Sequence, residues 1–259
     1  MADPASGLCV AIATRNNIAT IKRTVESVAD LADRVVIVDS GSTDGTDEWC
    51  GDHGCEVVGR EWPGMVAQRQ FCLDHCASFD WILLLDSDES LEPDLAADIR
   101  EAVERNETAF DGYAFNRKVF FKGAWLHHVF QPEWRLRLVR GGMASVGGAS
   151  GSAGGHDRLS VPGRVGRLKG DCRHDSWRDL SDILDRGIAY GRRSAETGQR
   201  GGSLRKLLLN PPAAFLKQMV LRRGFLDGWR GFVISGGVAA GTFMKHLLIH
   251  EARHRGNDQ

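Results

Sequence analysis

The sequence of 259 residues lacks the signals of a secreted, disulfide-bonded protein. It contains six cysteines but no Cys-x-x-Cys pair, and Cys9 lies within an apolar run. No charged segment followed by a hydrophobic run occurs near its start, so we expect no signal peptide. We therefore predict that the cysteines are small, buried, unpaired side chains in a reducing compartment.

Long apolar runs and internal repeats are also absent. No run of 18 apolar residues occurs, and Phe232–Met244 has 13 residues, three of which are glycine. A helix that crosses a bilayer needs about 20 predominantly apolar residues. The sequence therefore does not predict a membrane span.

The net charge is small, but the charged residues are unevenly distributed. The formal net charge is -1, yet residues 1–110 contain 8 Lys or Arg against 22 Asp or Glu. Residues 111–199 contain 15 against 9, and residues 200–259 contain 10 against 3. The basic second half suggests that it meets an anionic surface. We expect no nucleic-acid partner.

Short apolar runs alternate with helical patterns through the first 110 residues. Buried strands are predicted at Leu8–Ala13, Arg34–Val38, Cys55–Val58 and Trp81–Leu85. Helices are predicted to begin near Ile18, Asp47, Met65 and Pro93. This alternation predicts an α/β domain whose mostly parallel central sheet has flanking helices.

Acidic residues follow two of these strands. Asp39 ends the second strand, and Asp86 and Asp88 follow the apolar run Trp81–Leu85. The carboxyl ends of strands in an open α/β sheet form the crevice where ligands bind. Two aspartates one residue apart can share a divalent cation that also binds phosphate oxygens. The pattern predicts a nucleotide site with a metal; a solvated acidic turn is the alternative.

These motifs resemble those of the family 2 glycosyltransferases. The matching segments are Thr14–Asn16, Val38–Thr46 and Leu85–Glu89. Two further segments, Arg60–Gly64 and Gly224–Trp229, resemble the branch that includes bacterial lipopolysaccharide inner-core β-glucosyltransferases. The resemblance covers nearly the whole chain and implies a GT-A fold, the nucleotide-diphospho-sugar transferase fold, with a C-terminal helical extension.

The resemblance also implies a role for each matching residue. Asp39 would contact the nucleoside of a UDP-sugar, Asp86 would lie near its ribose and diphosphate, and Asp88 would bind Mg²⁺ or Mn²⁺ with Asp86. The family often has Glu where this chain has Asn17, so one ribose contact is expected to differ. The other nucleotide-sugar residues that we assign are Thr14, Arg15, Asn16, Ser42, Arg69, Ser87 and Arg137.

The family inverts the anomeric carbon in one displacement, which needs a base on the acceptor hydroxyl and a cation on the departing diphosphate. The branch has a His-Glu pair after its last sheet strand, and this chain has His156-Asp157 there. We assign Asp157 as the base, with His156 as the alternative. The preceding Gly141–Gly155, rich in Gly, Ala and Ser, departs from the family pattern and is predicted to be a mobile loop.

Three other side chains have two possible roles each, one in the site and one in the structure. Arg135 and Arg137 alternate along a predicted strand, Trp134–Val139, and so share a face. Guanidinium groups suit phosphate, but a structural salt bridge is equally consistent with this pattern. His174 follows the last predicted strand, where the branch also has a histidine, and packing is its alternative role.

We therefore predict an inverting hexosyltransferase. It would move a hexose, with glucose favoured by the resemblance, from a UDP-sugar to a saccharide acceptor, either lipopolysaccharide core or another lipid-linked glycan. A haloacid-dehalogenase-type phosphatase also combines an apolar strand with Asp-x-Asp, but the expected Thr or Val after the second Asp is absent. A sugar-nucleotide-binding protein without transferase activity is a second alternative, favoured by the irregular segment 141–155.

The C-terminal region is apolar and basic. We divide the chain into a catalytic domain of residues 1–200 and an amphipathic helical region of residues 201–259. Amphipathic helices with Lys and Arg lie in the interface of anionic membranes. We therefore expect a cytoplasmic enzyme that is peripheral on the inner face of the cytoplasmic membrane. Helices packed on the domain, or a dimer interface, are the alternatives, and the oligomeric state stays open.

Overall fold

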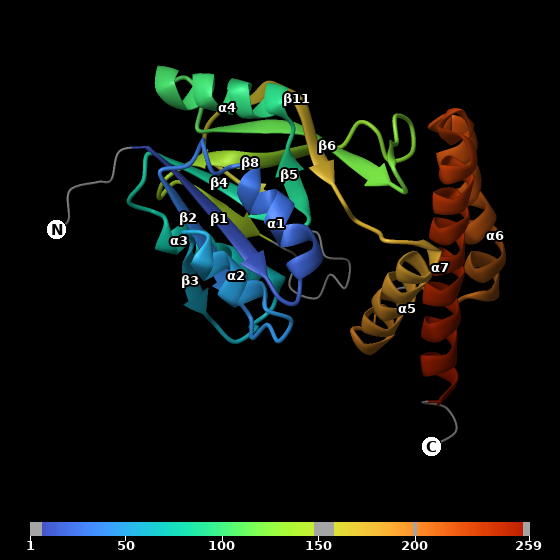
Figure 1. Cartoon of the computed structure of the whole chain (residues 1–259). Coiled ribbons are helices and arrows are strands. Elements are labelled where there is room, and N and C mark those ends of the chain that lie inside the picture. Colours follow the sequence, from blue (N-terminus) through green and yellow to red (C-terminus); the bar gives the residue numbers. More distant parts are fainter. Residues whose placement is uncertain (1–6, 148–157, 199–200, 256–259) are drawn as a thin grey trace. The chain divides into compact units, whose positions relative to one another are not determined.

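The computed structural model describes residues 7–147, 158–198 and 201–255 (Figure 1). They form two compact units, each of which is described by itself. The first unit contains the described residues of 1–117, 133–148 and 157–174, and the second contains those of 118–132 and 175–259.

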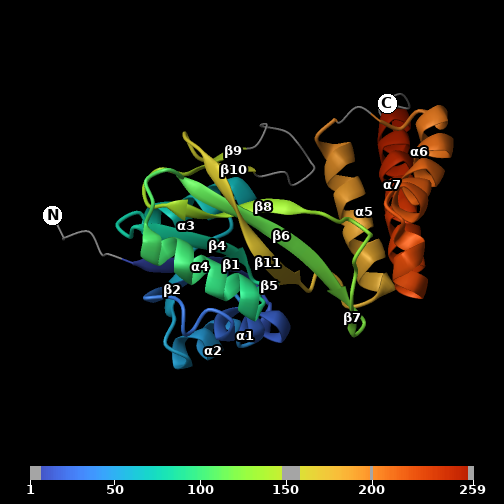
Figure 2. The ribbon, with the colours of Figure 1, turned by 90° about the horizontal axis from the view of Figure 1, so that it is seen from above.

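A mixed sheet forms the centre of the first unit, with the strand order β3-β2-β1-β4-β8-β6-β11-β5 (Figure 2). Its parallel strands are β1 (Leu8–Thr14), β2 (Arg34–Asp39), β3 (Glu56–Gly59) and β4 (Trp81–Asp86). The other strands are β5 (Glu89–Leu91), β6 (Gly112–Phe121), β8 (Trp134–Arg140) and β11 (Val165–His174). β8 is antiparallel to β4 and β6, and β11 is antiparallel to β5. The predicted α/β fold is confirmed.

Helices cover both faces of the sheet. One face is covered by α1 (Ile18–Glu26), α2 (Thr46–Asp52) and α4 (Pro93–Arg105). The other is covered by α3 (Met65–His75) and by the hairpin of β9 (Ser145–Gly147) and β10 (Arg158–Ser160). Successive residues of a strand point to opposite faces, so two covered faces bury every residue of Trp81–Leu85. All six cysteines are buried and unpaired, as predicted.

The second unit is mainly helical. It contains α5 (Leu180–Glu196), α6 (Leu204–Leu216), a π-helical turn (Lys217–Leu221), a 3-10 turn (Gly224–Asp227) and α7 (Gly228–Arg255), with the end of β6 and β7 (Ala124–Trp125). Figures 1 and 2 both show α5, α6 and α7 side by side. Their core combines Ile183 and Ile234 with Val119, Phe121 and other apolar residues.

The second unit therefore begins earlier than the predicted boundary near residue 200. The reason is the close packing of α5 on α7: a Cβ atom added at Gly187 would lie 2.8 Å from the Cα atom of Gly241. The predicted loop Gly141–Gly155 also differs, because Ser145–Gly147 forms β9; its residues from 148 onward lie outside the described part of the chain.

Within the described residues, one helix qualifies as a candidate membrane span, which the sequence did not predict. Gly224–His254 is long and apolar enough by length and composition, with a mean hydropathy of 1.5 over 18 residues, of which 28% are buried. Glycine and small hydroxyl residues such as Ser235 interrupt the apolar run in the sequence but lower its mean hydropathy only slightly. Length and composition do not distinguish a membrane span from an exposed helix of another kind.

Candidate active site

Three strands of the first unit end at the same level of the sheet. In the parallel register, Thr14 is opposite Asp39 and Ala13 is opposite Asp86. Asp39 and Asp86 therefore lie at the same carboxyl edge, two strands apart, on either side of β1. This is the edge at which open α/β sheets bind ligands.

Asp39 organises the loop that follows β2. Its Oδ2 atom accepts hydrogen bonds from the backbone N–H groups of Gly41 and Ser42, both at 2.8 Å, and its Oδ1 atom accepts one from the Ser42 hydroxyl. Gly41 has a φ of +79°, a conformation that suits glycine. The carboxylate is thus held in one orientation while 4% of the residue is exposed.

The loop after β1 is joined to this loop. The backbone N–H of Asn16 donates to Ser42 Oγ at 2.9 Å, and its side-chain Oδ1 accepts from the N–H of Thr43 at 2.7 Å. Arg15 and Asn16 are exposed, whereas Thr14 is buried at the end of β1. The predicted residues Thr14, Arg15, Asn16, Asp39 and Ser42 are therefore brought together at one edge.

Two polar atoms at this edge have no hydrogen-bond partner among the described residues. They are Thr14 Oγ1 and Gln68 Oε1, both buried. The other end of the Gln68 amide donates to Ser40 Oγ at 3.1 Å. Buried polar atoms without partners are rare in folded proteins, so they mark a place where water or a ligand completes the bonding.

Arginines surround Asp86. Arg69 from α3 contacts its Oδ1 atom, and Arg137 from β8 donates to Oδ2 at 2.7 Å. Arg117 from β6 is 3.6 Å from the same Oδ2 atom. The predicted residues Arg69 and Arg137 thus both reach Asp86, and three guanidinium groups converge beside the carboxyl end of β4.

A second carboxylate, Glu89, pairs with two of these arginines. It has no exposed surface, and its Oε1 atom accepts from Arg117 Nη1 at 2.9 Å and from Arg137 Nη2 at 2.7 Å. Its Oε2 atom accepts from the backbone N–H of Asp86 at 3.0 Å. Burial alone would raise the pKa of Glu89, but the charges of Arg137, Arg117 and His174 outweigh it and hold that pKa far below its ordinary value.

Sequence reasoning missed Glu89 and Arg117 as parts of the site. Glu89 ends the matching segment Leu85–Glu89, but its arginine partners lie 28 and 48 residues further along the chain. Only the pairing of β4 with β8 and of β8 with β6 brings those arginines to it.

Glu133 extends the cluster outward. It accepts hydrogen bonds from Arg117 Nε at 3.0 Å and Nη2 at 2.9 Å, and from Arg135 Nη2 at 2.6 Å. Burial raises the pKa of Glu133, but these two arginines outweigh it and lower the pKa to about 2. Arg135 and Arg137 share a face as predicted, and each is paired with a carboxylate.

We expect the depressed pKa of Glu133 to make stability acid-sensitive. Unfolded Glu titrates near pH 4.3, so the stabilisation is complete above about pH 5 and is lost as the pH falls towards 2. Glu133→Gln removes this titration, so its free energy of unfolding should fall by about 2 kcal/mol less than that of wild type between pH 6 and pH 2.5. Urea unfolding at both pH values measures the difference; equal losses in the two proteins would contradict it.

Asp88 lies beside a histidine. The antiparallel pairing of β5 with β11 places His174 opposite Glu89, and His174 Nε2 is 3.6 Å from Asp88 Oδ2. Ser87, between the two aspartates, is buried, and its carbonyl accepts from Thr24 Oγ1 at 3.1 Å. The turn is therefore anchored to α1 while Asp88 faces His174.

These donors fit a divalent cation. No group of three or more His, Cys, Asp or Glu side chains forms a complete metal cluster within the described residues. Asp88 nevertheless offers a carboxylate, which suits Mn²⁺ or Mg²⁺, and His174 offers an imidazole, which suits Mn²⁺ better than Mg²⁺; diphosphate oxygens would supply other ligands. Arginines occupy both oxygens of Asp86. Asp88 is therefore the stronger candidate for a metal ligand.

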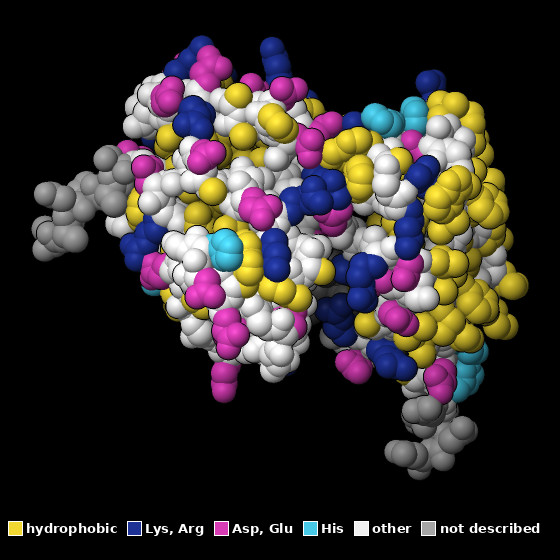
Figure 3. All heavy atoms as spheres, viewed as in Figure 1, with side chains coloured by type: hydrophobic (Ala, Val, Ile, Leu, Met, Phe, Trp, Pro, Cys, Tyr) yellow, Lys and Arg dark blue, Asp and Glu magenta, His cyan; other side chains and the backbone are white. Residues whose placement is uncertain are grey.

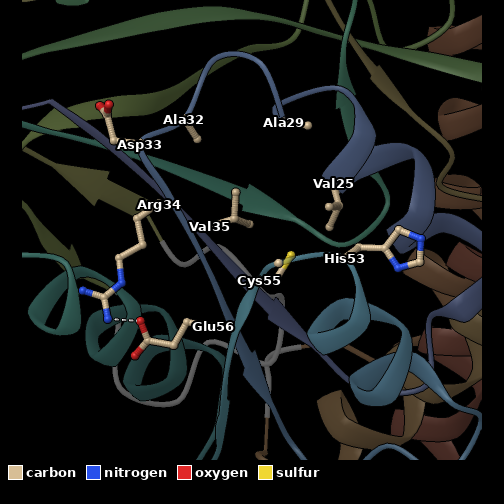
Figure 4. A pocket seen from close by; sticks show the side chains of 10 residues that line it. Val25, Ala29, Ala32, Asp33, Arg34, Val35, His53, Cys55 and Glu56 are labelled. Atoms are coloured by element: carbon tan, nitrogen blue, oxygen red, sulfur yellow. Dashed lines mark ion pairs between the residues drawn. The ribbon is translucent and has the colours of Figure 1, made fainter.

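His156 and Asp157 lie outside the described residues, so their assignment remains a prediction. A pocket of ≈ 550 Å³ lies at the opposite, amino ends of β2 and β3, near Val35, His53 and the ion-paired Arg34 and Glu56 (Figure 4). It is separated from Asp39 by the length of β2 and is not the site described above.

Comparison with known proteins agrees with this class of fold. The family model described as glycosyl transferase family 2 matches residues 9–155, and the chain belongs to that family. It therefore has the GT-A fold and is a glycosyltransferase, as predicted. A phosphatase of the haloacid dehalogenase type is not supported, because the family match includes the Asp-Ser-Asp segment.

The individual relatives named below share less than 30% sequence identity with this chain. An uncharacterised glycosyltransferase of Rickettsia prowazekii is 28% identical over 251 residues, which cover 93% of this chain and 85% of the relative. The lipopolysaccharide core biosynthesis glycosyltransferase LpsC of Rhizobium meliloti is 26% identical over 90% of both chains. The solved structure of S. aureus TarS with UDP is 14% identical over 96% of this chain and 92% of that chain, with a TM-score of 0.48.

Proposed function

We propose that this protein is an inverting hexosyltransferase that uses a UDP-sugar, glucose foremost, and a divalent cation. The observation that carries the proposal is the convergence of Asp39, Asp86 and Asp88 at one carboxyl edge, beside Arg69 and Arg137. A nucleotide needs a hydrogen-bond acceptor for its nucleoside and positive charge for its diphosphate, and this edge presents both.

Each residue would have a distinct task. The fixed Asp39 carboxylate would accept hydrogen bonds from the base or ribose. The Thr14 hydroxyl, which has no partner among the described residues, would hydrogen-bond to the same nucleotide. Asp88 and His174 would hold Mg²⁺ or Mn²⁺, which when bound offsets the negative charge of the departing diphosphate. Arg69 and Arg137 contact Asp86 and fix its orientation, and Glu89 in turn pairs with Arg137.

The transfer itself exchanges one bond for another at the anomeric carbon. The acceptor hydroxyl oxygen bonds to that carbon as the bond from the carbon to the diphosphate oxygen breaks, and the hydroxyl proton passes to a base. Asp157 is our candidate for that base and His156 is the alternative. The electron pair of the broken bond leaves with UDP, and the configuration of the sugar inverts.

The acceptor that we propose is a lipid-linked saccharide such as lipopolysaccharide core. The support is the family branch together with the similarity to LpsC over 90% of both chains. A screen of UDP-hexoses for UDP release in Mn²⁺, followed by mass analysis of a glycosylated lipid extract, tests donor and acceptor separately. Release from another nucleotide sugar but from no UDP-hexose would overturn the donor assignment.

Asp157→Asn should lower kcat by about 10²–10⁴-fold, the range that general-base catalysis contributes, with donor affinity nearly unchanged. The reason is that the amide cannot take the acceptor proton but keeps the size of the side chain. Steady-state kinetics measure kcat, and calorimetry with UDP measures donor-site affinity. Near-normal turnover in Asp157→Asn with loss in His156→Ala would assign the role to His156 instead.

A further inference from the structure

The second unit exposes an unusual amount of apolar side-chain surface. Leu208, Leu216, Leu221, Phe225, Leu226 and Phe232 are each more than half exposed, and Leu221 reaches 79%. Figure 3 shows hydrophobic side chains gathered over α6 and α7. We call the surface of these six residues the C-terminal apolar face. An exposed apolar surface of this kind marks a site that binds another surface.

Charge in the C-terminal segment is mainly positive. Residues 197–250 contain eight Lys or Arg but a single acid, Asp227. Asp227 is occupied within the unit, because its carboxylate accepts from the backbone N–H groups of His127, His128 and Val129 at 2.8, 3.1 and 2.9 Å. An apolar face within a basic segment fits a partner that is both apolar and anionic.

The packing of α5 argues against a membrane-spanning α7. A Cβ atom at Gly237 would lie 2.5 Å from Ile183, and Gly187 meets Gly241, so α5 covers one side of α7 along its middle. The exposed side of α5 is charged, because Asp185, Arg186, Arg192 and Arg193 are all exposed. Charged side chains are costly in hydrocarbon, so the pair of helices cannot be immersed. The opposite, apolar side can still enter an interface.

We propose that the C-terminal apolar face docks the protein on an anionic lipid bilayer, with α6 and the start of α7 lying in the interface and no helix crossing it. This inference goes beyond the proposed function and does not depend on it. Trp229 is 57% exposed and its ring lies 4.8 Å from the Arg230 guanidinium. An aromatic ring next to a cation suits the boundary between headgroups and acyl chains.

Vesicle flotation tests the proposal with the full chain. We expect the protein to float with phosphatidylcholine vesicles that contain phosphatidylglycerol at low salt, and less at high salt. The double variant Leu221→Glu, Phe225→Glu should bind these vesicles at least about tenfold more weakly, because two exposed apolar anchors are lost. Val165→Glu, an exposed position of β11 in the other unit, is the matched control and should float like wild type.

We expect the double variant to fold, because both altered side chains are more than half exposed. Circular dichroism and thermal melting check that it does. Wild-type protein that stays soluble with anionic vesicles at low salt would overturn the proposal. Unchanged flotation of the double variant would show that the C-terminal apolar face does not carry the membrane binding. Resistance to alkaline carbonate extraction would show a span instead, and a dimer in light scattering that the double variant dissociates would show that a second copy covers the face.

Discussion

Asp88→Ala is expected to lower kcat/KM for glycosyl transfer by about 10³-fold or more, the largest effect on activity that we predict. A bound cation supplies several kcal/mol of charge stabilisation in the transition state, and about 1.4 kcal/mol corresponds to a tenfold change in rate. Asp88 is the carboxylate of the motif that faces His174 at 3.6 Å, whereas both oxygens of Asp86 face arginines. Loss of Asp88 therefore removes the carboxylate donor while the arginine cluster remains.

The measurement combines kinetics with calorimetry of UDP binding, with and without Mn²⁺. Wild type should bind UDP more tightly in Mn²⁺, and Asp88→Ala should lose this difference while melting at a similar temperature. Asp52→Asn, an exposed acid at the end of α2, is the matched control and should behave as wild type. The same Mn²⁺-dependent gain in Asp88→Ala and in wild type would show that the cation binds elsewhere.

Glu89→Leu is expected to have the largest effect on stability, a loss of about 3–5 kcal/mol in the free energy of unfolding. The substitution leaves Arg117 and Arg137 buried without the carboxylate that both contact, and it removes the acceptor of the Asp86 backbone N–H. Breaking a buried ion pair by removing one partner is costly, because water cannot replace the lost carboxylate; Glu133 and Asp86 still compensate part of the charge of Arg117 and Arg137. The melting temperature should fall by about 6–20 °C for a unit of this size.

Thermal melting of wild type, Glu89→Leu and Glu89→Gln at neutral pH tests this expectation. Glu89→Gln keeps the shape and a hydrogen-bond acceptor, so it should lower the melting temperature less than Glu89→Leu does. Comparing the two variants separates the effect of the lost charge from that of the changed side-chain shape. The control is Glu101→Gln, which alters an exposed pair with Arg105 on α4 and should cost about 0.5 kcal/mol or less. If Glu89→Leu melts within about 2 °C of wild type, the buried cluster does not stabilise the fold as we infer.

Local patterns determined much of the first unit. The run Trp81–Leu85 predicted a buried strand because five successive apolar residues suit a strand with both faces covered, and β4 ends at Asp86. The positions of Asp39 and Asp86 at strand ends then placed both acids at one edge, because parallel neighbouring strands end together. The alternation of strands and helices predicted the α/β class. Each of these patterns can be recognised because it lies within a few consecutive residues of the chain.

Contacts between distant segments decided the rest. Arg117 and Arg137 meet Glu89, and His174 meets Asp88, only because β8 and β11 run antiparallel to strands that precede them by many residues. The membership of α5 in the second unit likewise depends on glycines of two helices that touch. The sequence alone determined which residues form strands, which acids end them and which segments are apolar and basic. The tertiary structure decided which arginines neutralise which acids and which apolar side chains remain exposed, because both depend on strand register and helix packing between residues far apart in the chain.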